Sequence, residues 1–63
     1  MGIATIILDA VEAKIVEHKL DVPSGRRRDP RWLLRNLRIR NSAYKHLDEV
    51  EDLCIAAIDS LEG

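Results

Sequence analysis

Residues that interrupt regular secondary structure are concentrated in one short part of this chain. Both prolines, Pro23 and Pro30, and the only glycine away from the two ends, Gly25, lie between positions 23 and 30. A small β-barrel or β-sandwich needs turn residues at short intervals along the whole chain. The pattern therefore argues against an all-β fold and predicts an all-α protein with one clear break.

Apolar residues before the break recur at helical spacing, which predicts a helix over about residues 3–20. After the break, Asp29 followed by Pro30 is a typical helix start, with an N-cap residue and then proline at the first helical position. Residues 21–29 are accordingly predicted to form an arginine-rich loop. The predicted buried stripe of the first helix consists of Ile3, Ala4, Ile7, Leu8, Val11 and Ile15.

Residues 30–62 contain no glycine and no further proline, and two interpretations of them stay open. The first is a single long helix, which gives a two-helix hairpin. The second has a break within about residues 41–46, which gives three helices, because Asn41 and Ser42 are poor helix formers and plausible caps. The apolar stripe of this segment runs through Leu33, Leu37, Tyr44, Leu47, Cys54, Ile58 and Leu61.

The length of 63 residues permits one small domain, residues 1–63. Aromatic residues make up only 3% of the chain, so its core must be aliphatic, and a single cysteine excludes an internal disulfide. A chain this short buries little apolar surface by itself. We therefore expect an antiparallel bundle completed by oligomerisation, with a homodimer as the simplest case, or by docking onto a larger protein partner. The predicted helix contacts join Ile7, Val11 and Ile15 to Leu33, Leu37, Val50, Cys54, Ile58 and Leu61.

Charge is strongly segregated along the chain, although the formal net charge is only −1. Residues 1–22 carry two bases and four acids, residues 23–46 carry eight bases and one acid, and residues 47–63 carry six acids and no base. All seven arginines lie between positions 26 and 40. The chain thus joins an arginine-rich middle to an acidic C-terminal segment.

Four arginines, Arg28, Arg31, Arg35 and Arg38, are spaced by three and four, so on a helix they form one ridge. Guanidinium groups suit phosphate and carboxylate alike. The ridge is therefore expected to face either a nucleic-acid backbone or the acidic segment of this chain or of a second copy. The pI of 6.1 weighs against a dedicated nucleic-acid-binding protein. The predicted contact residues are Arg26, Arg27, Arg28, Arg31, Arg35 and Arg38, with Trp32 and Tyr44 as interface anchors.

No set of side chains in the sequence indicates catalysis. Cys54 lies in the most apolar part of the chain and is expected to be a small buried residue, with a disulfide to a second copy left open. His46 and Glu49 share a helix face, but two ligands do not make a metal site. His18 is expected to be solvated near a helix end, and the acids of residues 48–52 to form a solvated helix start. We expect no catalytic residue, no cofactor and no metal.

The second half of the chain contains a set of residues that can be compared with the sequence pattern of a known protein family. Its residues are Trp32-Leu33-Leu34-Arg35-Asn36, then Asn41, Tyr44-Lys45, Asp48-Glu49-Val50, Asp52, Cys54, Ala57 and Leu61. With a one-residue gap between Trp32 and Asn41, residues 32–61 resemble the C-terminal tail of mariner-type insertion-sequence transposases, which have a DDE catalytic domain. That family places its third catalytic carboxylate just before the tryptophan, where this chain has Asp29 instead of glutamate. The sheet that carries the other two acids is missing, so the resemblance implies a tail fragment without nuclease activity.

Together these features predict a small, non-catalytic protein–protein interaction or regulatory module, whose arginine segment and acidic helix select the partner. The alternative is a nucleic-acid-binding regulator that uses Arg26–Arg40, and retention on nucleic acid that weakens steeply with salt would distinguish it. The chain start lacks the basic region of a signal peptide, and the apolar run of residues 3–8 is too short to cross a bilayer. We therefore expect a cytoplasmic protein without membrane contact.

Overall fold

The computed structural model describes residues 2–63, which form three α-helices and one short 3-10 helix. Helix α1 spans Ile3–Glu17, η1 spans Ser24–Arg26, α2 spans Pro30–Arg40 and α3 spans Leu47–Glu62. The predicted all-α fold is confirmed. Of the two interpretations of residues 30–62, the one with three helices is right, and the predicted break is the connection between α2 and α3.

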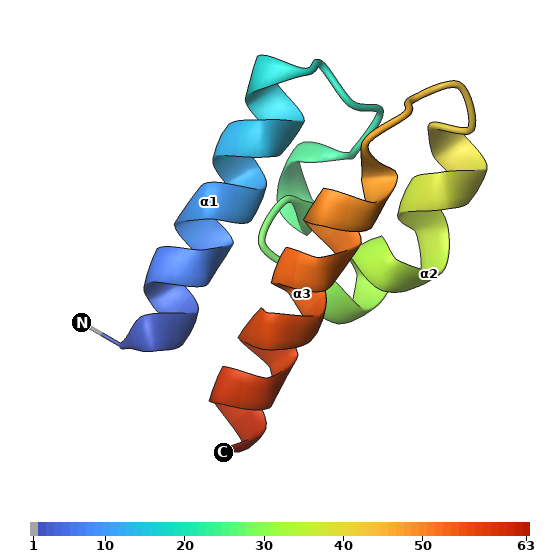
Figure 1. The fold of residues 1–63 in the computed structure, drawn as a ribbon. Helices are drawn as coiled ribbons and strands as arrows, with labels where there is room; N and C mark the ends of the chain where they lie inside the picture. The colour runs from blue at the N-terminus through green and yellow to red at the C-terminus, as the bar shows by residue number, and fades with distance from the viewer. Residues whose placement is uncertain (1) are drawn as a thin grey trace.

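Helix α3 lies between the other two helices and packs against both, whereas α1 and α2 contact each other far less. In Figure 1, α1 and α2 both run upward and α3 runs downward, so α3 is antiparallel to each of them. The first turn of α1 and the last turn of α3 lie at the same end of the bundle. The predicted antiparallel packing is therefore found between α3 and each of the other two helices, whereas α1 and α2 run in the same direction.

Helix α1 ends at Glu17, three residues before the predicted end. The backbone of Lys19 is left-handed, with φ of 53°. The N–H of Lys19 donates to the Val16 carbonyl at 3.2 Å, and the N–H of Leu20 donates to the Ile15 carbonyl at 2.9 Å. These two bonds form a Schellman motif, which usually has glycine at the left-handed position. Because Leu20 still packs against the core after the turn, the apolar pattern continues past the real end of the helix.

Polar side chains mark both ends of α2. Oδ1 of Asp29 accepts a hydrogen bond of 3.1 Å from the Trp32 N–H, with proline at the first helical position, which confirms the predicted start. At the other end, Nδ2 of Asn41 donates to the Leu37 carbonyl at 3.0 Å. Oδ1 of Asn41 also accepts a bond of 2.7 Å from the Asp21 N–H. Asn41 therefore ends α2 and ties that end to the segment that follows α1.

The core is aliphatic, as the composition predicts, and within residues 2–63 no charged residue is fully buried. Two predicted core residues are exposed instead, Ile3 at 70% and Leu61 at 62%. Both lie in end turns, Ile3 at the start of α1 and Leu61 at the close of α3, where the bundle no longer covers them. Ile7 and Ile58 are half-buried. The buried hydrophobic residues of the core are Val11, Ile15, Val22, Leu33, Leu37, Leu47, Val50, Cys54 and Ala57, and Pro30 at the start of α2 is buried as well.

None of the helices in residues 2–63 combines the length and the apolar character needed to cross a membrane. The longest, α3, has 16 residues and carries six carboxylates.

The left-handed Lys19 leads to a stability prediction. We expect Lys19→Gly to raise the free energy of unfolding by about 1 kcal/mol, because a β-carbon in the left-handed region costs ~1–2 kcal/mol and glycine gives back part of that as unfolded-chain entropy. For a domain of this size, such a gain raises Tm by about 4–8 °C. Lys19→Ala is the matched control, since it removes the same side chain and keeps the β-carbon. Equal Tm values for the two variants in thermal denaturation would contradict the explanation.

Cys54 gives a second prediction. It is fully buried, and burial, with a smaller effect of Glu51, raises the pKa of its thiol to about 11. The burial speaks against a disulfide between folded copies. We expect the rate of labelling by a thiol reagent at about pH 8 to rise with urea along the same curve as the loss of helical circular dichroism, since the thiolate is the reactive form. Fast labelling of the native protein would show that α3 opens locally.

Candidate interaction surfaces

The seven arginines do not form one surface. Those on α2 face in several directions. Before α2, Arg28 turns toward α1 and Arg26 turns toward the start of α2. Because carboxylates match most of these guanidinium charges, the segment presents less positive surface than its sequence suggests. Five arginines pair within residues 2–63: Arg26 with Asp29, Arg28 with Asp9 and Glu12, Arg31 with Glu62, Arg38 with Asp48 and Glu51, and Arg40 with Asp21.

The prediction that Arg28 belongs to the arginine ridge is wrong. Helix α2 begins only at Pro30, so Arg28 lies in the preceding loop and is out of line with the helical arginines. Its Nη1 donates to Oδ1 of Asp9 at 2.7 Å and to Oε1 of Glu12 at 3.0 Å, both on α1. These bonds raise the pKa of Arg28, so the guanidinium stays charged. Arg28 fastens the arginine-rich loop to α1.

Arg31 and Arg38 reach across to α3. Nη2 of Arg31 donates to Oε1 of Glu62 at 2.6 Å. Nη2 of Arg38 donates to Oδ1 of Asp48 at 3.0 Å and to Oε1 of Glu51 at 2.6 Å. At these two positions the ridge faces the acidic segment of its own chain, one of the expected arrangements. Such exposed pairs add little stability, but they set the register of α2 along α3.

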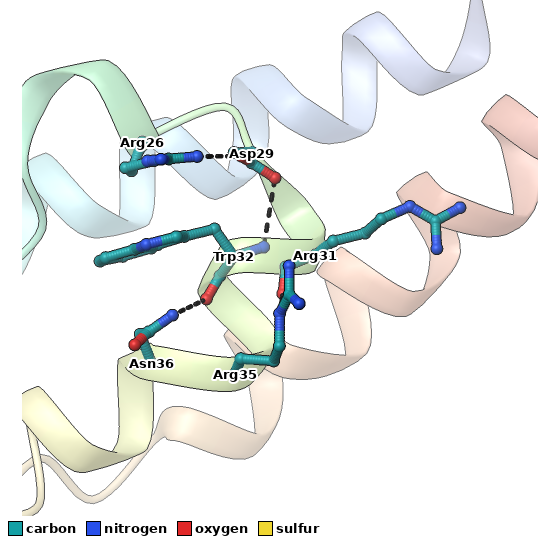
Figure 2. Close-up of polar contacts among 6 residues, drawn as sticks. All are labelled: Arg26, Asp29, Arg31, Trp32, Arg35 and Asn36. Atoms are coloured by element: carbon teal, nitrogen blue, oxygen red, sulfur yellow. Dashed lines mark hydrogen bonds and ion pairs between the residues drawn. The ribbon is translucent and has the colours of Figure 1, made fainter.

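Asp29 holds the start of α2 from two directions, as Figure 2 shows: Oδ1 accepts from the Trp32 N–H, and Oδ2 accepts from Nη1 of Arg26 at 2.9 Å. The bond from the Trp32 amide, followed by Arg26, holds the pKa of Asp29 below its usual value. The Arg26 guanidinium also lies 5.8 Å from the centre of the Trp32 ring, and that of Arg40 lies 5.6 Å from it. The predicted anchor Trp32 is thus half-buried beside arginines of its own chain.

Tyr44, the second predicted anchor, lies in the loop between α2 and α3 and packs against the core. Its ring centre lies 5.2 Å from that of His18 and 5.8 Å from that of His46. Its hydroxyl is buried and has no hydrogen-bond partner among residues 2–63. Arg27, a predicted contact residue, is half-buried, and its Nε is also buried without a hydrogen-bond partner among residues 2–63. Tyr44 therefore belongs mainly to the interior of the bundle.

A shallow apolar groove of about 320 Å³ lies between α2 and α3. Its lining residues are Arg31, Leu34, Arg35 and Ile58. Arg35 is the arginine of α2 that has no carboxylate partner among residues 2–63, and its Nε donates to the Arg31 carbonyl at 3.3 Å. Ile55, which is 49% exposed, precedes Ile58 by one turn of α3. The groove thus combines an apolar floor with one guanidinium that forms no ion pair within residues 2–63.

Helix α1 carries a second apolar stripe, on its solvent side, which we call the outer α1 stripe. It consists of Ile3, Ile6, Ala10, Ala13 and Val16, all exposed. Ile6 is 57% exposed and Val16 is 55% exposed. Their spacings of three and four place them along one side of the helix. The sequence pattern does not reveal this stripe, because α1 is apolar around most of its circumference and periodicity alone does not say which apolar side faces the core.

Comparisons with protein-family models, with curated proteins and with solved structures found no match. The resemblance of residues 32–61 to a transposase tail therefore stays a prediction.

The Asp29 cap gives a prediction that depends on pH. We expect Asp29→Ala to lower the free energy of unfolding by about 1 kcal/mol through loss of the N-cap bond. Asp29→Asn keeps an acceptor oxygen and removes the charge. Since the folded pKa of Asp29 lies below the ordinary 3.8, its charge stabilises the fold above that pH, and this contribution is lost as the pH falls through the folded pKa. In urea unfolding, the advantage of the parent chain over Asp29→Asn should shrink below about pH 3.8; a constant advantage would contradict the assignment.

Proposed function

We propose that this chain is a non-catalytic protein–protein interaction module that acts in the cytoplasm as a homodimer, with the outer α1 stripe as the contact surface. The observation that carries the proposal is the exposure of three large aliphatic side chains along one side of one helix, Ile3, Ile6 and Val16. Contiguous exposed apolar residues on a small protein mark a contact surface. The expectation that so short a chain gains from association supports the same proposal.

The sizes of the side chains favour an antiparallel pair of α1 helices. The middle of the stripe lies near Ala10, so a two-fold axis at that point sets Ala10 against its copy and Ile6 against Ala13. Small residues at the crossing let the two backbones approach, and the isoleucines fill the space beside the alanines. A parallel pair would put isoleucine against isoleucine at one end of the stripe and leave a gap between alanines in its middle.

Charge at the two ends of α1 favours the same orientation. The first turn of α1 has no acidic residue, and Gly2 offers no side-chain cap, so the N–H groups there carry uncompensated partial positive charge. Glu17 continues the stripe at the other end of the helix, and its side chain is 69% exposed. In an antiparallel pair, Glu17 of each copy lies beside the first turn of the other copy. A parallel pair would bring the two Glu17 carboxylates together.

The ion pairs of the arginine segment favour this proposal over nucleic-acid binding. Phosphate contact needs guanidinium groups that are free to leave their present partners, and five of the seven are paired. The carboxylates of α3 that hold Arg31 and Arg38 would also repel a phosphate backbone.

The first test places a charge on the proposed two-fold axis. Ala10→Glu changes an exposed residue, so the monomer should keep its helical circular dichroism while the mass measured by light scattering at about 100 µM falls by half or more. Ile39→Glu is the matched control, because Ile39 is an exposed aliphatic residue of α2, 79% accessible and outside the stripe. An unchanged mass for Ala10→Glu, or an equal loss for Ile39→Glu, would overturn the proposal.

Cysteine cross-linking tests the orientation. Ala10→Cys should form a disulfide-linked dimer readily, because residues on the axis bring their β-carbons within bonding range. Ala13→Cys should not, because Ala13 faces Ile6 of the other copy. Efficient cross-linking at both positions would mean that the helices pair in parallel.

A further inference from the structure

We infer that the outer face formed by α2 and α3 is a second contact between copies of this chain, in which Ile55 of one copy enters the groove of the other and Arg35 meets Asp52 and Asp59. This contact uses none of the residues of the outer α1 stripe and does not rest on the homodimer proposed above. It concerns the arginine segment, which that homodimer leaves unexplained.

Two charged columns run side by side on this face. On α2, Arg31, Arg35 and Arg38 follow one another at spacings of four and three, which keeps them on one side of the helix. On α3, five residues repeat at spacings of four and three in the same way. The ion pairs of Arg38 with Asp48 and of Arg31 with Glu62 show that the two columns border each other. The α3 column consists of Asp48, Asp52, Ile55, Asp59 and Glu62.

The contacts within the chain leave specific charges unused. The ends of the α3 column, Asp48 and Glu62, are bound by arginines of the same chain. Arg35, Asp52 and Asp59 form no ion pair with any of residues 2–63. The middle of the face therefore holds one free cation on α2 and two free carboxylates on α3, with Leu34, Ile55 and Ile58 between them.

A face of this kind is complementary to itself for only one type of two-fold axis. An axis parallel to the helices carries the basic column of one copy onto the acidic column of the other, twice in each dimer. An axis across the helices would set arginine against arginine and carboxylate against carboxylate. Charge complementarity therefore selects a second copy as the occupant and also its orientation.

The same two-fold axis also brings apolar residues of the two copies together. Because α2 and α3 are antiparallel, and Arg38 reaches Glu51 while Arg31 reaches Glu62, Arg35 lies at about the level of Ile55. The axis thus brings Ile55 of one copy, 49% exposed in the single chain, over the groove beside Arg35 of the other. A branched aliphatic side chain suits a groove of about 320 Å³ whose floor is Leu34 and Ile58. Arg35, the charge that Figure 2 shows beside Arg31, borders this groove.

The test is a charge-reversal complementation in the Ala10→Glu background, which removes the α1 contact. In that background the chain should be a dimer of twice 7.2 kDa. Arg35→Glu sets one carboxylate against Asp52 and Asp59 in each half of the contact. Asp52→Lys with Asp59→Lys sets two lysines against Arg35, so each variant alone should be monomeric. In an equimolar mixture both halves of the contact become attractive, and a heterodimer should form. A mixture that stays monomeric would overturn the inference.

Two controls keep the outcomes separate. The substituted residues are exposed, so circular dichroism and Tm should show that each variant is folded. As a second control in the Ala10→Glu background, Ile55→Glu should yield a monomer, whereas Ile39→Glu should leave the dimer intact. If the Ala10→Glu chain is a monomer, the α2–α3 contact is wrong and the α1 proposal is unaffected. If Ala10→Glu does not change the mass of the parent chain but the mixed variants form heterodimers, the α1 proposal is wrong and the α2–α3 contact is supported. Retention of a DNA duplex that Arg35→Glu abolishes, with no change in mass, would show that the face binds nucleic acid and that the inference is wrong.

Discussion

The bundle depends on the apolar side of α3. Leu47, Val50, Cys54 and Ala57 of this helix are buried against α1 and α2, while those two helices contact each other far less. Burial of aliphatic surface is the main driving force available to a chain with so few aromatic residues. Because each of the outer helices needs only one side to cover α3, each keeps another side free. The surfaces on which both proposals rest follow directly from this arrangement.

The charges are arranged around this core and do not create it. The arginine-rich middle and the acidic C-terminal segment lie far apart in the sequence, but the antiparallel packing of α2 on α3 turns them into neighbouring columns. Pairs such as Arg31 with Glu62 are exposed to water, so they contribute more to register than to stability. Arg28 likewise fixes the position of the loop before α2 through its ion pair with Asp9 of α1. The charges left over in the middle of the α2–α3 face are the ones that a second copy can satisfy.

The two proposed contacts lie on different sides of the bundle. Each is a two-fold contact, in which the same patch is used by both copies. Through the second contact, homodimers paired by α1 would join into either a closed tetramer or a linear assembly, according to the angle between the two axes. The outer α1 stripe supplies mostly apolar area, and the α2–α3 face supplies charge complementarity, so the second contact is the more sensitive of the two to salt.

The sequence by itself determined those features of the fold that depend on residues close together along the chain. Helical spacing, the start of α2 at Asp29 and Pro30, and the aliphatic centre of the core were all predictable, because capping and periodicity act within a few residues. The choice between two and three helices stayed open, since Asn41 is a weak local signal whose bond to Asp21 exists only after folding. Tertiary structure alone decided that α1 ends at Glu17, that Arg28 pairs with Asp9 and Glu12 of α1, and which side of α1 stays in water. Each of these depends on where a distant segment packs, and no local pattern contains that information.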